Sequence, residues 1–205
     1  MQAFPGLVRP PGAAHIRLHY LCPERNMKPK SLVLLLALAA APASVLAANV
    51  TDPDAPRSVA GDTVSVSWAD PSSFSDLRYS GNRWAAAQGD WVNQLAQYLQ
   101  KRAAARLPEG ARMEVTITDV QRAGRYEPWL GMQYDQVRIM RDTYPPRMKL
   151  EVRITGADGQ VLAEGERKLQ DTGYLQRTAT NDSDVLRYEK RMIDDWLRRE
   201  LPPAV

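Results

Sequence analysis

Five stretches of the chain are predicted to be β-strands, and those at residues 63–68, 113–118 and 148–154 alternate between apolar and polar residues, which is the pattern of a strand with one buried face. In the first of them Val64, Val66 and Trp68 share one face. Asp158-Gly159 is a hairpin signal between the last two. The pattern predicts strands at residues 63–68, 113–118, 136–140, 148–154 and 161–169.

Two further stretches carry apolar residues at the spacing of one helix face. The first predicts a helix from a cap at Asp90 to about Leu107, with an inner stripe of Trp91, Val92, Leu95, Ala96, Leu99 and Ala103. The second predicts a helix over residues 181–201, capped by Asp182 or Ser183. Its inner stripe would be Val185, Tyr188, Met192, Ile193, Trp196 and Leu197.

The element order is therefore β-α-β-β-β-β-α. It predicts an α+β domain over residues 63–201, in which a mainly antiparallel five-stranded sheet carries two amphipathic helices on one face. Residues 48–62 contain Pro53, Pro56 and Gly61 with few apolar residues, and they are predicted to form a flexible leader.

A solidly apolar run at residues 31–41 follows Lys28 and Lys30 and leads to Val45-Leu46-Ala47. A basic start, an apolar centre and small residues at the end are typical of a secretory signal peptide, here residues 27–47 with cleavage after Ala47. We interpret residues 1–26 as a disordered product of an upstream start codon. The alternative is an uncleaved membrane anchor, against which Pro42 and the alanine-rich second half of the run both argue.

Cleavage changes the charge and the available chemistry. The precursor carries 27 basic and 24 acidic residues, a net charge of +3, and the segment to be removed is basic. The mature chain is then nearly neutral, so we expect no nucleic-acid partner. His15, His19 and Cys22 would also be lost, which excludes catalytic triads, thiol nucleophiles and Cys/His zinc sites. A periplasmic or secreted protein without stable membrane insertion is expected.

Two segments that follow predicted strands hold the candidate site residues. The first contributes Asp70, Phe74, Asp76 and Arg78, and the second contributes Arg125, Tyr126, Glu127 and Trp129. Charged side chains and aromatic rings on loops can bind a ligand or a partner. The alternative is structural: Asp and Pro start turns, and aromatic residues pin loops to a core. Both interpretations stay open from sequence.

The leading hypothesis is a non-enzymatic protein of the bacterial envelope that binds a protein or glycan through these two loops. No catalytic residue, metal ligand set or cofactor is predicted. The second hypothesis is a carboxylate-based or metal-assisted hydrolase, which needs Asp70, Asp76 and Glu127 to converge on one pocket. A third is assembly through an unprotected sheet edge.

Four motifs occur in order along the chain. They are Trp68-Ala-Asp-Pro71 with Phe74 and Asp76; Leu107-Pro-Glu-Gly110 before Ala123-Gly124 and Glu127-Pro128; Tyr144-Pro-Pro-Arg147; and Leu186-Arg-Tyr-Glu-Lys190 with Asp195-Trp196. The set resembles the bacterial family called domain of unknown function 3016, over roughly residues 60 to 200. The resemblance implies an exported protein of unassigned activity, and it supplies no catalytic residues.

Overall fold

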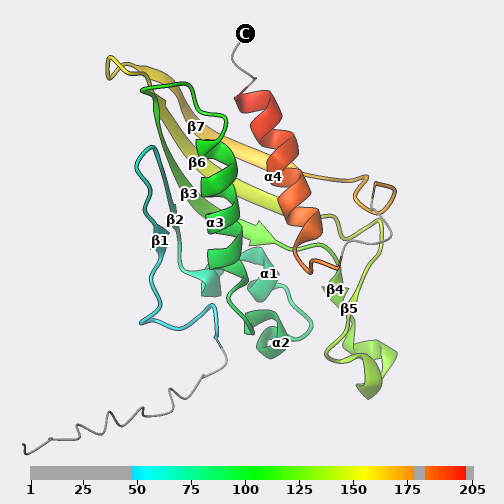
Figure 1. Ribbon diagram of the computed structural model, residues 1–205. Coiled ribbons are helices and arrows are strands. Elements are labelled where there is room, and N and C mark those ends of the chain that lie inside the picture. The colour runs from blue at the N-terminus through cyan, green and yellow to red at the C-terminus, as the bar shows by residue number, and fades with distance from the viewer. Residues whose placement is uncertain (1–47, 178–182, 202–205) are drawn as a thin grey trace, which may run out of the picture. The chain divides into compact units, whose positions relative to one another are not determined.

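The computed structural model describes residues 48–177 and 183–201. Their main feature is a five-stranded sheet in the order β1-β2-β3-β6-β7 (Figure 1). Neighbouring strands are antiparallel except β2 and β3, which run parallel, so the sheet is mixed. The strands span Ser58–Val59 (β1), Val64–Trp68 (β2), Arg112–Gln121 (β3), Arg147–Thr155 (β6) and Val161–Gln170 (β7).

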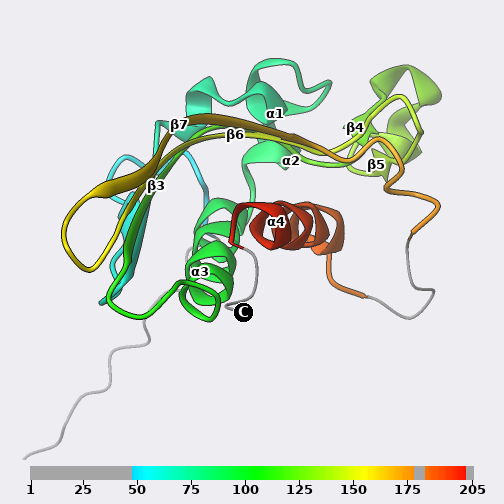
Figure 2. The same cartoon turned by 90° about the horizontal axis from the view of Figure 1, so that it is seen from above.

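Two long helices, α3 (Trp91–Ala104) and α4 (Arg187–Glu200), cover the same face of this sheet (Figures 1 and 2). The sheet residues that point toward them are buried in strict alternation along β6, from Met148 to Ile154. All six residues predicted for the stripe of the first helix are buried. The α+β prediction with both helices on one face is therefore confirmed.

Short elements occupy the lower end of the sheet in Figure 1, where β2 ends. The turn η1 (Pro71–Ser73), α1 (Ser75–Arg78) and α2 (Arg83–Ala87) connect β2 to α3. A separate two-stranded sheet pairs β4 (Arg125–Tyr126) with β5 (Arg138–Ile139). The 3₁₀ turns η2 (Pro128–Leu130) and η3 (Met132–Tyr134) lie in the loop between its strands.

A β-bulge in β3 attaches α1 to the sheet. The register of β3 against β6 shifts between Ile117 and Asp119, so Val120 takes the buried position that strict alternation would give to Asp119. The Asp119 carboxylate instead accepts hydrogen bonds from the backbone N–H and the hydroxyl of Ser75, at 2.6 and 2.7 Å. The bulge thus fixes the first residue of α1.

The membership of the main sheet differs from the prediction. Residues 136–140 were expected to form its third strand, but only Arg138–Ile139 is a strand, and it pairs with β4. The fifth position is filled by β1, which lies inside the segment predicted as a flexible leader. Two-residue strands carry too little alternation to be recognised from sequence, and hydrogen bonds to a neighbour define them.

The start of α4 also differs. The predicted helix began at residue 181, but α4 begins at Arg187, and the predicted cap Asp182 lies outside the described residues. Ser183 does not cap it. Val185, predicted for the buried stripe, is 79% exposed because it precedes the helix. Asp184 starts the turn instead, accepting the N–H of Leu186 at 2.8 Å.

Asp90 stands at the predicted cap of α3, but its carboxylate accepts a hydrogen bond from the side-chain amide of Asn93 and none from a backbone N–H. The Asp158-Gly159 hairpin is confirmed, with Gly159 at a φ of 79° between β6 and β7. In the described ranges, no helix combines the length and the apolar character needed to cross a bilayer.

Candidate functional site

Asp76 is a buried member of the predicted site residues and is bound by two arginines. It lies on α1 with a side chain only 2% exposed, between Arg122, which directly follows β3, and Arg138 on β5. Arg138 contacts both carboxylate oxygens at 3.0 Å, and Arg122 donates from Nε and Nη2 at 2.9 and 2.8 Å. The backbone N–H of Arg122 adds a fifth bond at 3.0 Å. We call these three residues the arginine clamp.

Aromatic rings hold both guanidinium groups of the arginine clamp. Arg122 lies 4.2 Å from the ring centroid of Trp91, and Arg138 lies 4.8 Å from that of Tyr126. Each such cation–π contact contributes about 0.5–2 kcal/mol, more when it is shielded from water. The clamp therefore joins α1, β3, β5 and the first residue of α3 with little freedom for its side chains.

The charges within the arginine clamp keep its carboxyl group and the Arg138 guanidinium group ionised. Burial opposes ionisation of Asp76, but the charges of Arg138 and Arg122 outweigh it and lower the pKa of the Asp76 carboxyl. Burial likewise opposes the charge of Arg138, and Asp76 reverses that effect and raises the pKa of Arg138. One carboxylate thus faces two guanidinium groups, and the clamp carries excess positive charge.

Glu189 of α4 lies next to the arginine clamp. It is 1% exposed, and its Oε1 accepts the backbone N–H of Ala123 at 2.6 Å. Its Oε2 has no hydrogen-bond partner within residues 48–177 and 183–201, and the same is true of Nε of Arg187. Burial raises the pKa of Glu189, although the Ala123 bond and the charge of Arg122 act against it. A buried polar atom without a partner costs about 1–3 kcal/mol.

Glu127 anchors the loop between β4 and β5. Its carboxylate accepts hydrogen bonds from Arg141 at 3.0 and 2.6 Å and from the Tyr144 hydroxyl at 2.7 Å. These bonds lower the pKa of Glu127 and raise that of Tyr144. The side chain of Glu127 is 2% exposed, because those two long side chains cover it. Glu127 is thus a structural brace at the base of the loop.

Beyond this brace, residues 128–137 form a projecting loop at the lower right of Figure 1. Arg125 holds the neighbouring segment, donating to the Tyr79 carbonyl at 2.8 Å. The Asn82 amide donates to the Asp135 carbonyl at 2.8 Å and ties the loop to the start of α2. Five large apolar side chains of the projecting loop are exposed: Trp129, Leu130, Met132, Tyr134 and Val137.

The other predicted residues serve the fold. Asp70 caps η1 by accepting bonds from the N–H and hydroxyl of Ser72 at 3.0 and 2.7 Å, which lowers the pKa of Asp70. Phe74 is fully buried, with its ring centroid 6.4 Å from that of Trp91. Arg78 lies 5.5 Å from the ring centroid of Tyr79 on the surface. The structural interpretation is correct for Asp70 and Phe74.

The three candidate carboxylates do not meet. Asp70 is bound by Ser72, Asp76 by the arginine clamp, and Glu127 by Arg141 and Tyr144. In the described part of the chain, no cluster of three or more His, Cys, Asp or Glu side chains is placed to hold a metal ion. The convergence that the hydrolase hypothesis requires is not met by these residues.

The structure does bring three predicted residues together. Asp76, Arg125 and Tyr126 line one small cavity of about 50 Å³ beside Arg138. Arg122 and Glu189 are not among the residues predicted from the sequence. A signal for Glu189 exists, because it lies three residues before Met192 and four before Ile193, on the buried stripe of α4. A carboxyl group at such a position indicates a buried polar partner.

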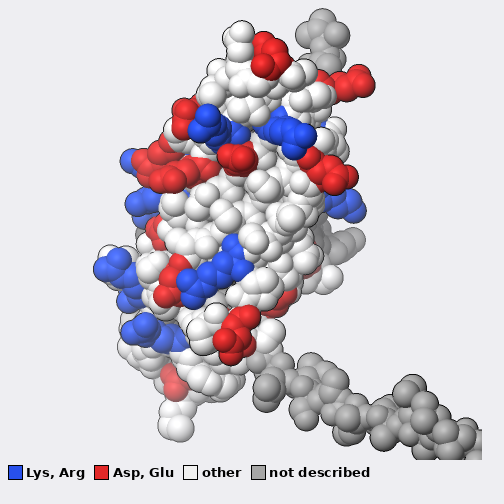
Figure 3. All heavy atoms as spheres, turned by 90° about the vertical axis from the view of Figure 1, so that its left-hand side faces the viewer, with Lys and Arg blue, Asp and Glu red and all other residues white. Residues whose placement is uncertain are grey.

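Charged side chains elsewhere are mixed. On the side of the molecule shown in Figure 3, positive and negative groups alternate, and neither sign forms an extended patch. The outward residues of β6 alternate with the buried ones, as the sequence predicts for a solvated face. Arg153 and Glu164 pair across that face at 3.9 Å.

A family model described as a protein of unknown function, DUF3016, matches residues 62–199. The match covers most of the described chain and confirms the resemblance drawn from the ordered motifs. No curated protein and no solved structure matches.

Proposed function

From the membership of this chain in the DUF3016 family, whose description assigns no activity, we propose that it is an exported, non-enzymatic binding protein of the bacterial envelope. Its recognition element is the projecting loop, residues 128–137. Its partner is an envelope protein that offers an apolar groove.

One observation carries this proposal: the projecting loop exposes large apolar side chains to solvent. Met132 is 89% exposed and Trp129 is 66% exposed. Contiguous exposed apolar patches mark interaction sites in soluble proteins, and Trp and Met are enriched where partners dock. Burying a Trp or Met side chain on binding contributes about 1.5–3 kcal/mol.

The base of the projecting loop supports the same role. The Glu127 brace and the bond from Asn82 fix both ends of the loop to the body of the domain. A loop already held near one conformation loses less entropy on binding, so more of the contact energy is left for affinity.

The side chains favour a protein over a glycan. A glycan site pairs an aromatic face with several hydrogen-bonding side chains, because sugars are covered with hydroxyls. Here Leu130, Met132 and Val137 add exposed apolar area to that of Trp129 and Tyr134, and the exposed amide side chains of the loop are two, Gln133 and Gln136. An apolar groove on a folded protein or a docked peptide matches that surface.

Export rests on the amino-terminal sequence: Lys28 and Lys30, the apolar run at residues 31–41, and Val45-Leu46-Ala47. Alkaline phosphatase, which needs disulfides to be active, can be fused after Ala48. The fusion should be active in intact bacteria, and the same fusion with Leu34 and Leu35 both changed to Arg should be inactive. An inactive fusion carrying the unchanged leader, or equal activity in both fusions, would contradict export.

The binding role is tested by capture on the purified protein, followed by identification of the retained envelope proteins. Trp129→Ala and Leu130→Ala should each reduce retention of the same partner by about tenfold. Leu162→Ala is the matched control, because Leu162 is 61% exposed and lies at the β6–β7 hairpin, at the other end of the molecule from the loop (Figure 1). Equal retention by all three variants would refute the role of the loop.

A further inference from the structure

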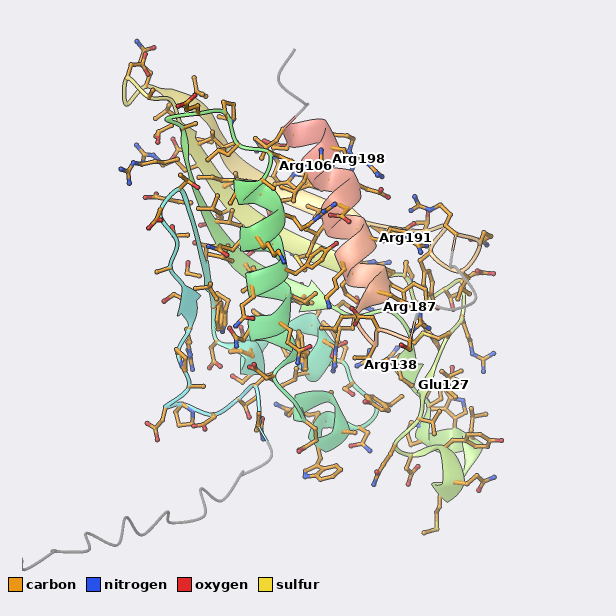
Figure 4. All side chains as sticks on the ribbon, viewed as in Figure 1. Arg106, Glu127, Arg138, Arg187, Arg191 and Arg198 are labelled. Atoms are coloured by element: carbon orange, nitrogen blue, oxygen red, sulfur yellow. The ribbon has the colours of Figure 1, made fainter. Side chains whose placement is uncertain are left out.

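Besides the projecting loop, the structure has a second candidate binding site, which adjoins the arginine clamp. A pocket of about 360 Å³ opens between β5 and the start of α4, and it is independent of the projecting loop. Its charged lining residues are Arg122, Arg138, Arg187 and Glu189, and Tyr126, Met140, Val185 and Leu186 provide apolar walls. We call it the arginine pocket. Figure 4 shows Arg138 and Arg187 near the amino-terminal end of α4.

The arginine pocket holds unsatisfied polar atoms. Three buried side-chain N or O atoms of the described residues lack a hydrogen-bond partner, and two of them, Glu189 Oε2 and Arg187 Nε, belong to residues of this pocket. The third, on Asp171, is ion-paired with Arg177. Glu189 is 1% exposed, so its free oxygen is turned away from bulk water. Buried polar atoms usually find partners, and a ligand can supply them.

The charge of the arginine pocket selects the sign of that ligand. Three guanidinium groups belong to the pocket, and the carboxyl groups beside them are Asp76, Glu189 and Asp184, of which Asp184 is paired with Lys190 at 2.5 Å. Positive charge is therefore in excess whether or not Glu189 is protonated. Guanidinium groups bind carboxylates in a planar, two-pronged geometry.

The guanidinium groups are also fixed in advance. Arg122 is stacked on Trp91, Arg138 on Tyr126, and Arg187 lies 4.4 Å from the ring centroid of Tyr188. Arg187 also donates to the Asp184 carbonyl and the Tyr188 hydroxyl, at 2.9 and 3.1 Å. Donors held by rings and backbone need little rearrangement to receive an anion.

From this arrangement we infer that the arginine pocket binds a small organic carboxylate with an apolar body. The carboxylate pairs with Arg187 and with Nη1 of Arg122, an atom that Asp76 does not bind, and the apolar body lies against Tyr126, Met140 and Leu186. When Glu189 is protonated, a shift of its side chain toward the pocket lets Oε2 donate a hydrogen bond to the ligand carboxylate. A mineral anion would leave the apolar walls uncovered, and a neutral apolar molecule would leave the charges unpaired.

Isothermal titration of the purified chain tests this inference with four carboxylates: benzoate, hexanoate, decanoate and N-acetyl-leucine. At least one should bind with one-to-one stoichiometry, and at least tenfold more tightly than its neutral alcohol or amide counterpart. It should also bind more tightly than inorganic phosphate. Absence of binding by all four at millimolar concentration would overturn the inference, and so would equal binding of the neutral counterpart.

Variants locate the binding in the arginine pocket. Arg187→Gln should weaken the binding about tenfold or more, and Arg191→Gln, one turn further along α4 and outside the pocket lining, should not change it. Val185 is exposed at the rim, so its replacement leaves the core intact: Val185→Asp should weaken the binding and Val185→Lys should strengthen it. Identical affinities in Val185→Asp and Val185→Lys would place the ligand elsewhere and contradict the inference.

Discussion

Asp76 and Arg138 form a two-pronged ion pair across 62 residues of sequence, with both oxygen–nitrogen distances at 3.0 Å. The pair joins the short helix after the first long strand to the small β4–β5 sheet. Because Arg122 approaches the same carboxylate, three segments converge on one buried charge. The position of both proposed binding surfaces, the projecting loop and the arginine pocket, depends on this convergence.

Removing the carboxylate charge should therefore destabilise the whole domain. Asp76→Asn leaves two largely buried guanidinium groups without their counter-charge, and the expected loss is about 3–5 kcal/mol in the free energy of unfolding. Asp70→Asn, in the same segment but exposed, should change it by less than about 1 kcal/mol. Urea denaturation measures both, and similar values for the two variants would show that the arginine clamp is not structural.

Glu189 should make stability depend on pH in the opposite sense to Asp76. Burial raises the pKa of folded Glu189 above its ordinary 4.5. Such a group contributes stability that is fully present below pH 4.5 and is lost as pH rises through the raised pKa. The free energy of unfolding falls by about 1.4 kcal/mol for every factor of ten by which folding lowers the acid dissociation constant of Glu189. Asp76 and Arg138 keep their charges over pH 5–8, because the pKa of Asp76 is lowered and that of Arg138 is raised.

Glu189→Gln keeps the acceptor for Ala123 and removes the titration. Relative to the wild type, this variant should gain stability steadily as pH rises above 4.5. Denaturation curves at intervals from pH 4 to pH 8 give the difference. A difference that is constant over that range would mean that Glu189 is ionised in the fold at its ordinary pKa.

Breaking the brace at the base of the projecting loop should affect the loop more than the domain. Glu127→Gln loses the charged bonds from Arg141 and weakens the one from Tyr144. Amide hydrogen exchange of residues 128–137 should become faster, while exchange in β3 and β6 stays unchanged. Partner retention should fall as well. Unchanged exchange in the loop would show that other contacts hold it.

Replacing a core leucine should lower the free energy of unfolding far more than replacing a surface leucine. Leu150 is fully buried under the helices, and Leu150→Ala should cost about 2–5 kcal/mol because it leaves a cavity. Leu162→Ala, at an exposed site on β7, should stay within about 0.5 kcal/mol of the wild type. Thermal or urea unfolding compares them, and a small loss for Leu150→Ala would place the core elsewhere.

The elements that could be predicted from the sequence are mostly those in which apolar residues recur at a regular spacing. Strands β3 and β6 and the stripe of α3 repeat their burial over many residues, so they were found with boundaries close to those observed. Strand β7, in which only Leu169 is buried, was found from the Asp158-Gly159 hairpin signal. The short strands β1, β4 and β5 are defined by hydrogen bonds to other segments of the chain. No local sequence pattern reveals such bonds. Val185 was misplaced because the helical spacing of apolar residues begins before Arg187, the first residue of α4.

The candidate site was predicted in part. Asp76, Arg125 and Tyr126 were predicted from residue type and do line one cavity, but their basic partner Arg138 lies in the strand predicted at residues 136–140 and was not among the candidate site residues. An ion pair between distant segments has no spacing rule, so residue type alone cannot match Asp76 to Arg122 and Arg138. Glu127 and Asp70 share their residue class with Asp76 and serve as a brace and a cap instead.

The most direct measurement is photo-crosslinking in the living bacterium from residue 129, with a photoreactive phenylalanine analogue in place of the Trp129 side chain. The same analogue at position 162, equally exposed but at the distant hairpin, is the control. We expect a discrete crosslinked envelope protein from position 129 and no product of the same mass from position 162. The same products from both positions, or none from position 129, would contradict it.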